Sequence, residues 1–145
     1  MPEVAEPVVR TVDIEAAPET VFAFFVDADK LNRWLTVDAT LDPRAGGVCT
    51  QQHAGADPER GPFAMQGRFV EVDPPHRVVF TWGFTDPEIG VPPGSTVVEV
   101  TLTPVGTGTR VTLVHRDLPA AAVDDHAAGW TEMLGRLARA VEETT

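Results

Sequence analysis

The chain has 145 residues, of which 43% are hydrophobic and 23% are charged, and its formal net charge is −11. This length suits one domain with its own hydrophobic core, and the composition is typical of neither a disordered chain nor a membrane protein. The negative charge disfavours nucleic acids and anionic lipid surfaces as partners, because both are bound through clusters of Lys and Arg.

The first seven residues contain acidic side chains and no apolar run, so they do not resemble a secretory signal. No later stretch approaches the roughly 20 apolar residues that a membrane-spanning helix needs. We therefore expect a cytoplasmic protein without membrane insertion. We expect one domain over residues 8–142, with short tails over 1–7 and 143–145.

Alternating residues from Val8 to Glu15, many of them β-branched, predict a half-buried strand. Pro18 then favours the start of a helix, since its fixed φ suits a first helical position. Asp27 is a plausible N-cap, and a second short helix is predicted from it through Leu35. The chain therefore opens with one strand and two helices.

Between Thr36 and Arg116, turn residues recur roughly every eight to twelve positions, which is typical of consecutive antiparallel strands. We expect these strands near residues 37–42, 46–53, 63–72, 76–84, 95–103 and 108–116. Two of them alternate cleanly. The strand near 76–84 carries Val78, Phe80, Trp82 and Phe84 on one of its faces, and the strand near 95–103 carries Val98, Val100 and Leu102 on one of its faces. One face of the sheet is thus apolar and must be covered.

The last segment supplies the cover, because its apolar residues recur at steps of four and three. They are Val123, Ala127, Trp130, Leu134, Leu137 and Val141. This spacing predicts one amphipathic helix of about 30 Å. A single helix about 10 Å wide cannot cover a flat sheet of six or seven strands, so the sheet must curve around it. Such curvature commonly leaves an apolar pocket of a few hundred Å³.

Four motifs carry a resemblance over nearly the whole chain, from about Val9 to Val141. They are Pro18-Glu19-Thr20-Val21-Phe22, the segment from Gly67 to Trp82, the segment from Gly108 to His115, and His126-x-x-Gly129-Trp130. The chain resembles the START-like or Bet v 1-like superfamily, and within it the group related to the activator of Hsp90 ATPase. This resemblance implies an α+β helix-grip fold, β-α-α-β6-α.

The resemblance implies fold better than activity. Similar domains bind lipids and hydrophobic metabolites, some cyclise or hydrate polyketides, and one branch stimulates a chaperone. The chain is negatively charged and has a single lysine, Lys30, which disfavours docking of this protein to a chaperone.

Aromatic and sulfur-containing side chains on separate elements are expected to meet at one cavity, since Trp and Met suit a pocket wall. The predicted ligand-binding residues are Phe25, Trp34, Phe63, Met65, Phe80, Trp82, Phe84, His115, His126, Trp130, Met133 and Leu137. Ordinary core packing explains each of them singly as well.

His115 closes the last strand and His126 lies in the first turns of the final helix, so we expect them to be neighbours at one end of the cavity. They are weak catalytic candidates, because an imidazole can carry a proton near neutral pH. The alternative is that each caps backbone groups.

Cys49, the only cysteine, stands four residues from His53 on a strand. That spacing separates the two by about 13 Å, so no thiol–imidazole pair is expected. We interpret Cys49 as a packing residue. No cofactor and no metal site are predicted, since no His or carboxylate cluster has the usual spacing.

The sequence therefore predicts a protein that binds a small hydrophobic ligand, a lipid or an aromatic metabolite, without catalysis. Two alternatives stay open. One is a cyclase, dehydratase or hydrolase with a histidine as proton carrier, and the other is an interaction module like the Hsp90 ATPase activator. A homodimer also stays open.

Overall fold

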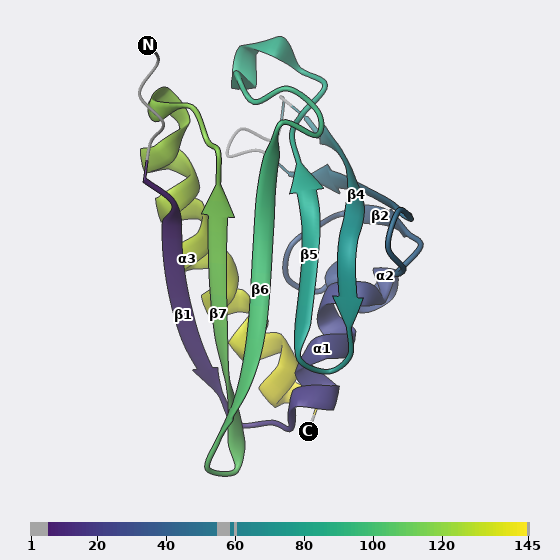
Figure 1. Ribbon diagram of the computed structural model, residues 1–145, viewed down its shortest axis with the longest axis vertical. Coiled ribbons are helices and arrows are strands. Elements are labelled where there is room, and N and C mark those ends of the chain that lie inside the picture. The colour runs from purple at the N-terminus through teal and green to yellow at the C-terminus, as the bar shows by residue number, and fades with distance from the viewer. Residues whose placement is uncertain (1–5, 55–58, 60, 145) are drawn as a thin grey trace.

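The strands form one antiparallel sheet in the order β1-β7-β6-β5-β4-β3-β2 (Figure 1). The computed structural model describes residues 6–54, 59 and 61–144. The strands are β1 (Val8–Ile14), β2 (Asp38–Leu41), β3 (Val48–His53), β4 (Phe63–Asp73), β5 (Arg77–Trp82), β6 (Thr96–Val105) and β7 (Gly108–Arg116). Residues 1–5 and 145 of the predicted tails lie outside the described residues.

The helices lie on one side of this sheet. They are α1 (Pro18–Val26), α2 (Ala28–Leu31) and α3 (Ala120–Glu143), and a 3₁₀ turn, η1 (Pro87–Ile89), follows β5. Figure 1 shows α3 crossing behind the sheet from the upper end of β7 to α1 at the lower end. The predicted helix-grip α+β fold, a curved antiparallel sheet around a long C-terminal helix, is confirmed. In the described part of the chain, no helix combines the length and the apolar character needed to cross a membrane.

Two predicted boundaries need correction. The second helix ends at Leu31 rather than near residue 35, and the chain continues in turns. The strand predicted over 76–84 stops at Trp82, and Phe84 pairs only in an isolated bridge with Met65. Gly83 explains the break, because a Cβ at this position would collide with the backbone carbonyl oxygen of Pro92. The loop after β5 therefore packs directly against the backbone at Gly83. This loop includes η1, which the sequence pattern did not predict.

The hydrophobic core lies between the inner face of the sheet and α3. The predicted inner faces of β5 and β6 are buried, as shown by Val78 and Val100, which have no exposed surface. The buried residues of α3 are Ala122, Trp130, Leu134, Leu137, Ala140 and Val141, whereas Val123 and Ala127 are only partly buried. Each large apolar side chain buried here contributes about 1.5–3 kcal/mol, so this interface dominates the stability of the fold.

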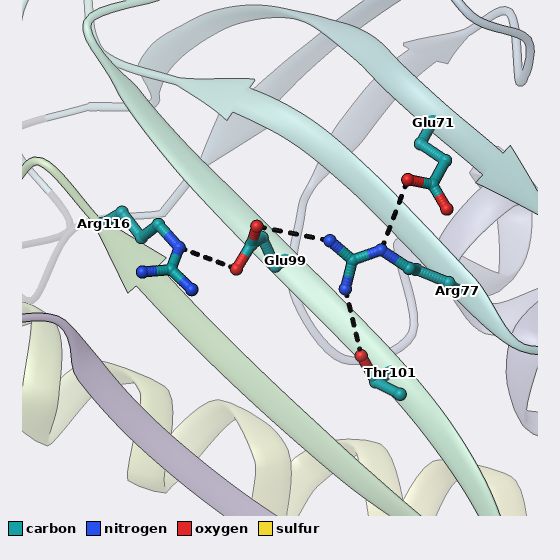
Figure 2. A network of polar contacts seen from close by, with 5 residues as sticks. All are labelled: Glu71, Arg77, Glu99, Thr101 and Arg116. Atoms are coloured by element: carbon teal, nitrogen blue, oxygen red, sulfur yellow. Dashed lines mark hydrogen bonds and ion pairs between the residues drawn. The ribbon is translucent and has the colours of Figure 1, made fainter.

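The outer face of the sheet carries a polar network that crosses four strands (Figure 2). Arg77 on β5 donates from Nε to Glu71 on β4 at 3.3 Å, and from Nη2 to Glu99 on β6 at 3.2 Å. Arg116 on β7 donates to the other oxygen of Glu99 at 2.7 Å. Thr101 also accepts from Arg77 at 3.3 Å. This face is polar, so an apolar molecule would find its site on the inner side, beside α3.

Candidate functional site

A cavity of about 390 Å³ opens at one end of the domain, between the first half of α3 and the ends of β3 and β5. Its size falls in the range of small-molecule sites. The start of β4 and the turn η1 complete the wall. The site therefore forms where the curved sheet and its loops separate from α3.

Six of the predicted ligand-binding residues line this cavity: Phe63, Trp82, Phe84, His126, Trp130 and Met133. The other six, Phe25, Trp34, Met65, Phe80, His115 and Leu137, are buried in the core and do not line it. Trp34 illustrates the difference, because its ring packs edge-on against Phe25 and its Nε1–H donates to the carbonyl oxygen of Phe24 at 3.0 Å.

Six further residues of the wall were missed by the sequence reasoning: Leu35, His53, Ala54, Ile89, Asp125 and Gly129. His53 could have been found from the alternation of β3, since Cys49 and Gln51 on the same face are buried. Its strand neighbour is Phe63, which was predicted. Ile89 lies in the turn η1, for which the sequence carries no periodic signal.

His115 is buried with both ring nitrogens bonded. Trp130 donates its Nε1–H to Nδ1 of His115 at 3.0 Å, and Nε2 of His115 lies 2.8 Å from the hydroxyl of Thr96. That hydroxyl donates to the carbonyl oxygen of Trp82 at 2.9 Å, so it must accept from His115. The network therefore fixes a neutral imidazole with its proton on Nε2.

His126 stands next to His115, with 5.3 Å between the ring centroids, and is bonded in a similar way. Its Nδ1–H donates to the carbonyl oxygen of Ala122 at 2.9 Å. Its Nε2 accepts from the indole N–H of Trp82 at 3.3 Å. The structure thus brings the two histidines together, as the sequence predicts, and each receives an indole donor.

Burial sets the charge of this cluster. It lowers the pKa of His115 to about 3 and that of His53 to about 4, and in both cases the nearby His126 adds to the effect. Burial also lowers the pKa of His126, against the opposing effects of the Ala122 carbonyl and the Asp125 carboxylate. The three imidazoles are consequently neutral at pH 7.

Cys49 and His53 do not contact each other but are joined through Gln51. The side-chain amide of Gln51 donates to Sγ of Cys49 at 3.4 Å, and its oxygen lies 2.8 Å from Nε2 of His53. Because a carbonyl oxygen only accepts, Nε2 of His53 carries the proton. Burial raises the pKa of Cys49 to about 12, so this thiol is not an activated nucleophile.

Aromatic rings hold the wall in place around Trp82. The ring centroids of His53, Phe84 and Trp130 lie 5.0, 5.4 and 5.2 Å from that of Trp82, in edge-on or tilted arrangements. Each such aromatic pair contributes about 0.5–1.5 kcal/mol beyond its buried area. The wall is therefore a packed, preformed surface.

The histidines do not form a metal site. Across the described ranges, no three His, Cys, Asp or Glu side chains gather so that they could hold a metal ion. In His115 and His126 the nitrogen lone pairs that a metal would need already accept indole hydrogen bonds.

Comparison with known proteins places the chain by family and by fold. The family model of the activator of Hsp90 ATPase homolog 1-like proteins matches residues 15–142. A search of curated protein sequences found no match. Three similar solved structures are informative.

The crystal structure of CV1439 from Chromobacterium violaceum is 26% identical, with a TM-score of 0.80 over 94% of this chain and 97% of that one. DynU16, encoded in the dynemicin biosynthetic locus, is 24% identical, with a TM-score of 0.78 over 95% of this chain and 48% of that one. The Aha1 dimer from Colwellia psychrerythraea is 18% identical, with a TM-score of 0.76 over 95% of this chain and 97% of that one.

Proposed function

This chain belongs to the family of activator of Hsp90 ATPase homolog 1-like proteins, and on that premise we propose that it binds a small hydrophobic molecule in the cavity beside α3, without catalysis, in the cytoplasm. The observation that carries this proposal is the cavity itself, whose 390 Å³ are walled mainly by aromatic and aliphatic side chains. Desolvation of such a wall by an apolar ligand is favourable by about 25 cal/mol per Å².

The preformed wall also supports binding. A ligand that enters a site already fixed by ring packing loses little free energy to ordering of the protein. Trp82, at the centre of the ring contacts, is 4% exposed, so its position is set by the core rather than by the ligand.

The state of the histidines favours binding over catalysis. A general acid or base needs a nitrogen that can reach the substrate and a pKa near the working pH. His115 is buried with both nitrogens occupied, and its pKa is about 3. Acceptance of a proton from a ligand by His115 or His126 would require the loss of an indole hydrogen bond from a packed wall.

Of the two histidines that the sequence predicted as weak catalytic candidates, only His126 lines the cavity. This half-buried residue lines the cavity, and its bond from Trp82, at 3.3 Å, is the longer of the two indole–histidine bonds. If the protein is a cyclase, dehydratase or hydrolase, His126→Gln should abolish turnover. A binding protein should keep most of its ligand affinity in this variant.

Native mass spectrometry of protein purified gently from its own host tests the binding proposal. We expect a retained apolar molecule as added mass. Gly129→Leu should remove it, because Gly129 lines the cavity and a Cβ there meets no atom within 4 Å. Gly135→Leu is the matched control, since Gly135 lies on the same helix but outside the cavity wall.

Repeated spectra without added mass, together with no thermal shift across a panel of lipids and aromatic compounds, would contradict the proposal. If the interaction-module alternative is correct, a pull-down from native lysate should recover a stable protein partner and extraction should recover no small molecule. A homodimer remains a separate expectation, and sedimentation velocity over a range of protein concentrations would test it.

A further inference from the structure

Among the residues that the structure describes, the wall of the cavity carries charge of one sign only. Twelve described residues line it, and Asp125 is the only one among them that is charged at pH 7, since His53 and His126 are neutral. No Lys or Arg of the described residues lines it. The whole chain adds a net charge of −11, which extends the negative potential beyond the site.

The side-chain hydrogen-bond donors of the wall are already in use. The indole N–H of Trp82 is bonded to His126, and that of Trp130 is bonded to His115. The Nδ1–H of His126 is bonded to Ala122, and the Nε2–H of His53 is bonded to Gln51. These four N–H groups are the only side-chain donors that the described lining residues possess.

What the described side chains of the wall have left to offer a ligand is acceptors. Asp125 contributes a carboxylate at the exposed rim, and His53 keeps a lone pair on Nδ1 because its proton lies on Nε2. A ligand that donates hydrogen bonds can therefore be satisfied without disturbing the wall. A ligand that only accepts would leave its polar end unpaired.

Charge separates the ligand classes further. A carboxylate would have to shed water beside Asp125 without a donor or a cation to replace that water, which is unfavourable. A protonated amine would gain an ion pair with Asp125.

We propose, on the basis of the binding function above, that the cavity takes apolar molecules whose polar end donates hydrogen bonds, an amine before an alcohol or phenol, and that it rejects the corresponding carboxylic acid. Asp125 makes the distinction between amine and alcohol. The alcohol is distinguished from the acid because the side-chain donors of the wall, among them the indole N–H groups of Trp82 and Trp130, are already bonded.

Three probes with one apolar body test this proposal: 2-naphthylmethylamine, 2-naphthalenemethanol and 2-naphthylacetic acid, titrated by calorimetry at pH 7. We expect the amine to bind most tightly, and the acid to bind at least about tenfold more weakly than the alcohol. Asp125→Asn should weaken the affinity for the amine by roughly threefold to tenfold, as for the loss of a partly exposed ion pair. It should leave the affinity for the alcohol unchanged.

Asp124→Asn is the matched control, because it removes the same charge from the adjacent, exposed position outside the cavity wall. It should change none of the three affinities. An equal effect of both variants would overturn the role of Asp125. An acid that binds as tightly as the alcohol would overturn the donor rule and leave the binding function intact. Failure of all three probes to bind would contradict the binding function itself.

Discussion

Trp82 and Trp130 pack with their ring centroids 5.2 Å apart, and each donates its indole N–H to a different histidine. The two strands and the helix that carry these four side chains are thus joined by polar contacts inside an apolar wall. Because an indole nitrogen only donates, each histidine must present a lone pair to it. Protonation of either histidine at that nitrogen would set two donors against each other.

Trp130→Phe should lower the free energy of unfolding by about 1–3 kcal/mol. Phenylalanine keeps much of the packing but leaves Nδ1 of His115 buried without a donor. Urea unfolding at pH 7 measures this loss. Met133→Leu, a volume-conserving change in the same wall, should cost less than about 1.5 kcal/mol. Equal losses in the two variants would show that the hydrogen bond is not the cause.

Stability should fall as the pH is lowered from 6.5 towards 4. In the unfolded chain a histidine has a pKa of about 6.5, whereas in the folded protein the pKa is about 4 for His53 and about 3 for His115. Between these pKa values the unfolded state binds more protons than the folded state. Each histidine therefore lowers the free energy of unfolding by about 1.4 kcal/mol for each pH unit that the pH falls. The full contribution is present above pH 6.5.

Urea unfolding between pH 6.5 and 5 measures this slope where most carboxylates are still ionised. His53→Gln removes one of the titrating groups and should make the slope shallower by about one histidine's share. A stability that does not change over this range would contradict burial of neutral imidazoles.

Glu99→Gln should destabilise the sheet by about 1 kcal/mol at low salt, and by less in 1 M NaCl. The carboxylate of Glu99 is 19% exposed and pairs with Arg77 and Arg116, whereas those two arginines are more exposed and screened by solvent. Glu132→Gln breaks an exposed pair with Arg136 on α3 and should cost at most about 0.5 kcal/mol. Thermal unfolding at two salt concentrations compares them, and equal effects would show that the network in Figure 2 has no special strength.

Gly67→Ala and Gly129→Ala should have opposite effects on stability. A Cβ at Gly67 would collide with the backbone carbonyl oxygen of Thr81, so the strands must shift and the melting temperature should fall. At Gly129, in the middle of α3, a Cβ meets nothing within 4 Å, and alanine should stabilise the helix by about 0.5–1 kcal/mol. Calorimetry of both variants checks the signs, and a stabilised Gly67→Ala would show that the strands separate freely there.

The parts of the fold that follow a period were predictable from the sequence. β5 and β6 alternate, α3 repeats every three or four residues, and these periods decide which side chains face the core whatever the rest of the chain does. Phe84 shows the limit. It keeps its inward position beyond the end of β5 because Gly83 packs against Pro92, a contact between distant residues that no local pattern records.

The site was only half predictable, for a related reason. Phe80 and Trp82 lie on the same face of the same strand and are equally buried, yet only Trp82 borders the cavity. The difference depends on where the sheet separates from α3, which composition does not encode. The sequence identified His115 and His126 as neighbours, but it could not show that two tryptophans would hold them neutral.

The pairing of β1 with β7 has a consequence for the synthesis of the protein. Val8, at the start of the first strand, pairs with His115, near the end of the last one. β1 therefore leaves the ribosome before the other six strands and has no strand partner until β7 has also emerged, since chains are made from the N-terminus and long-range pairing forms late. A chain interrupted before Gly108 would hold an unpaired β1 and, without α3, an uncovered apolar face. Nascent chains of this protein are thus most exposed to aggregation until β7 and α3 have both emerged.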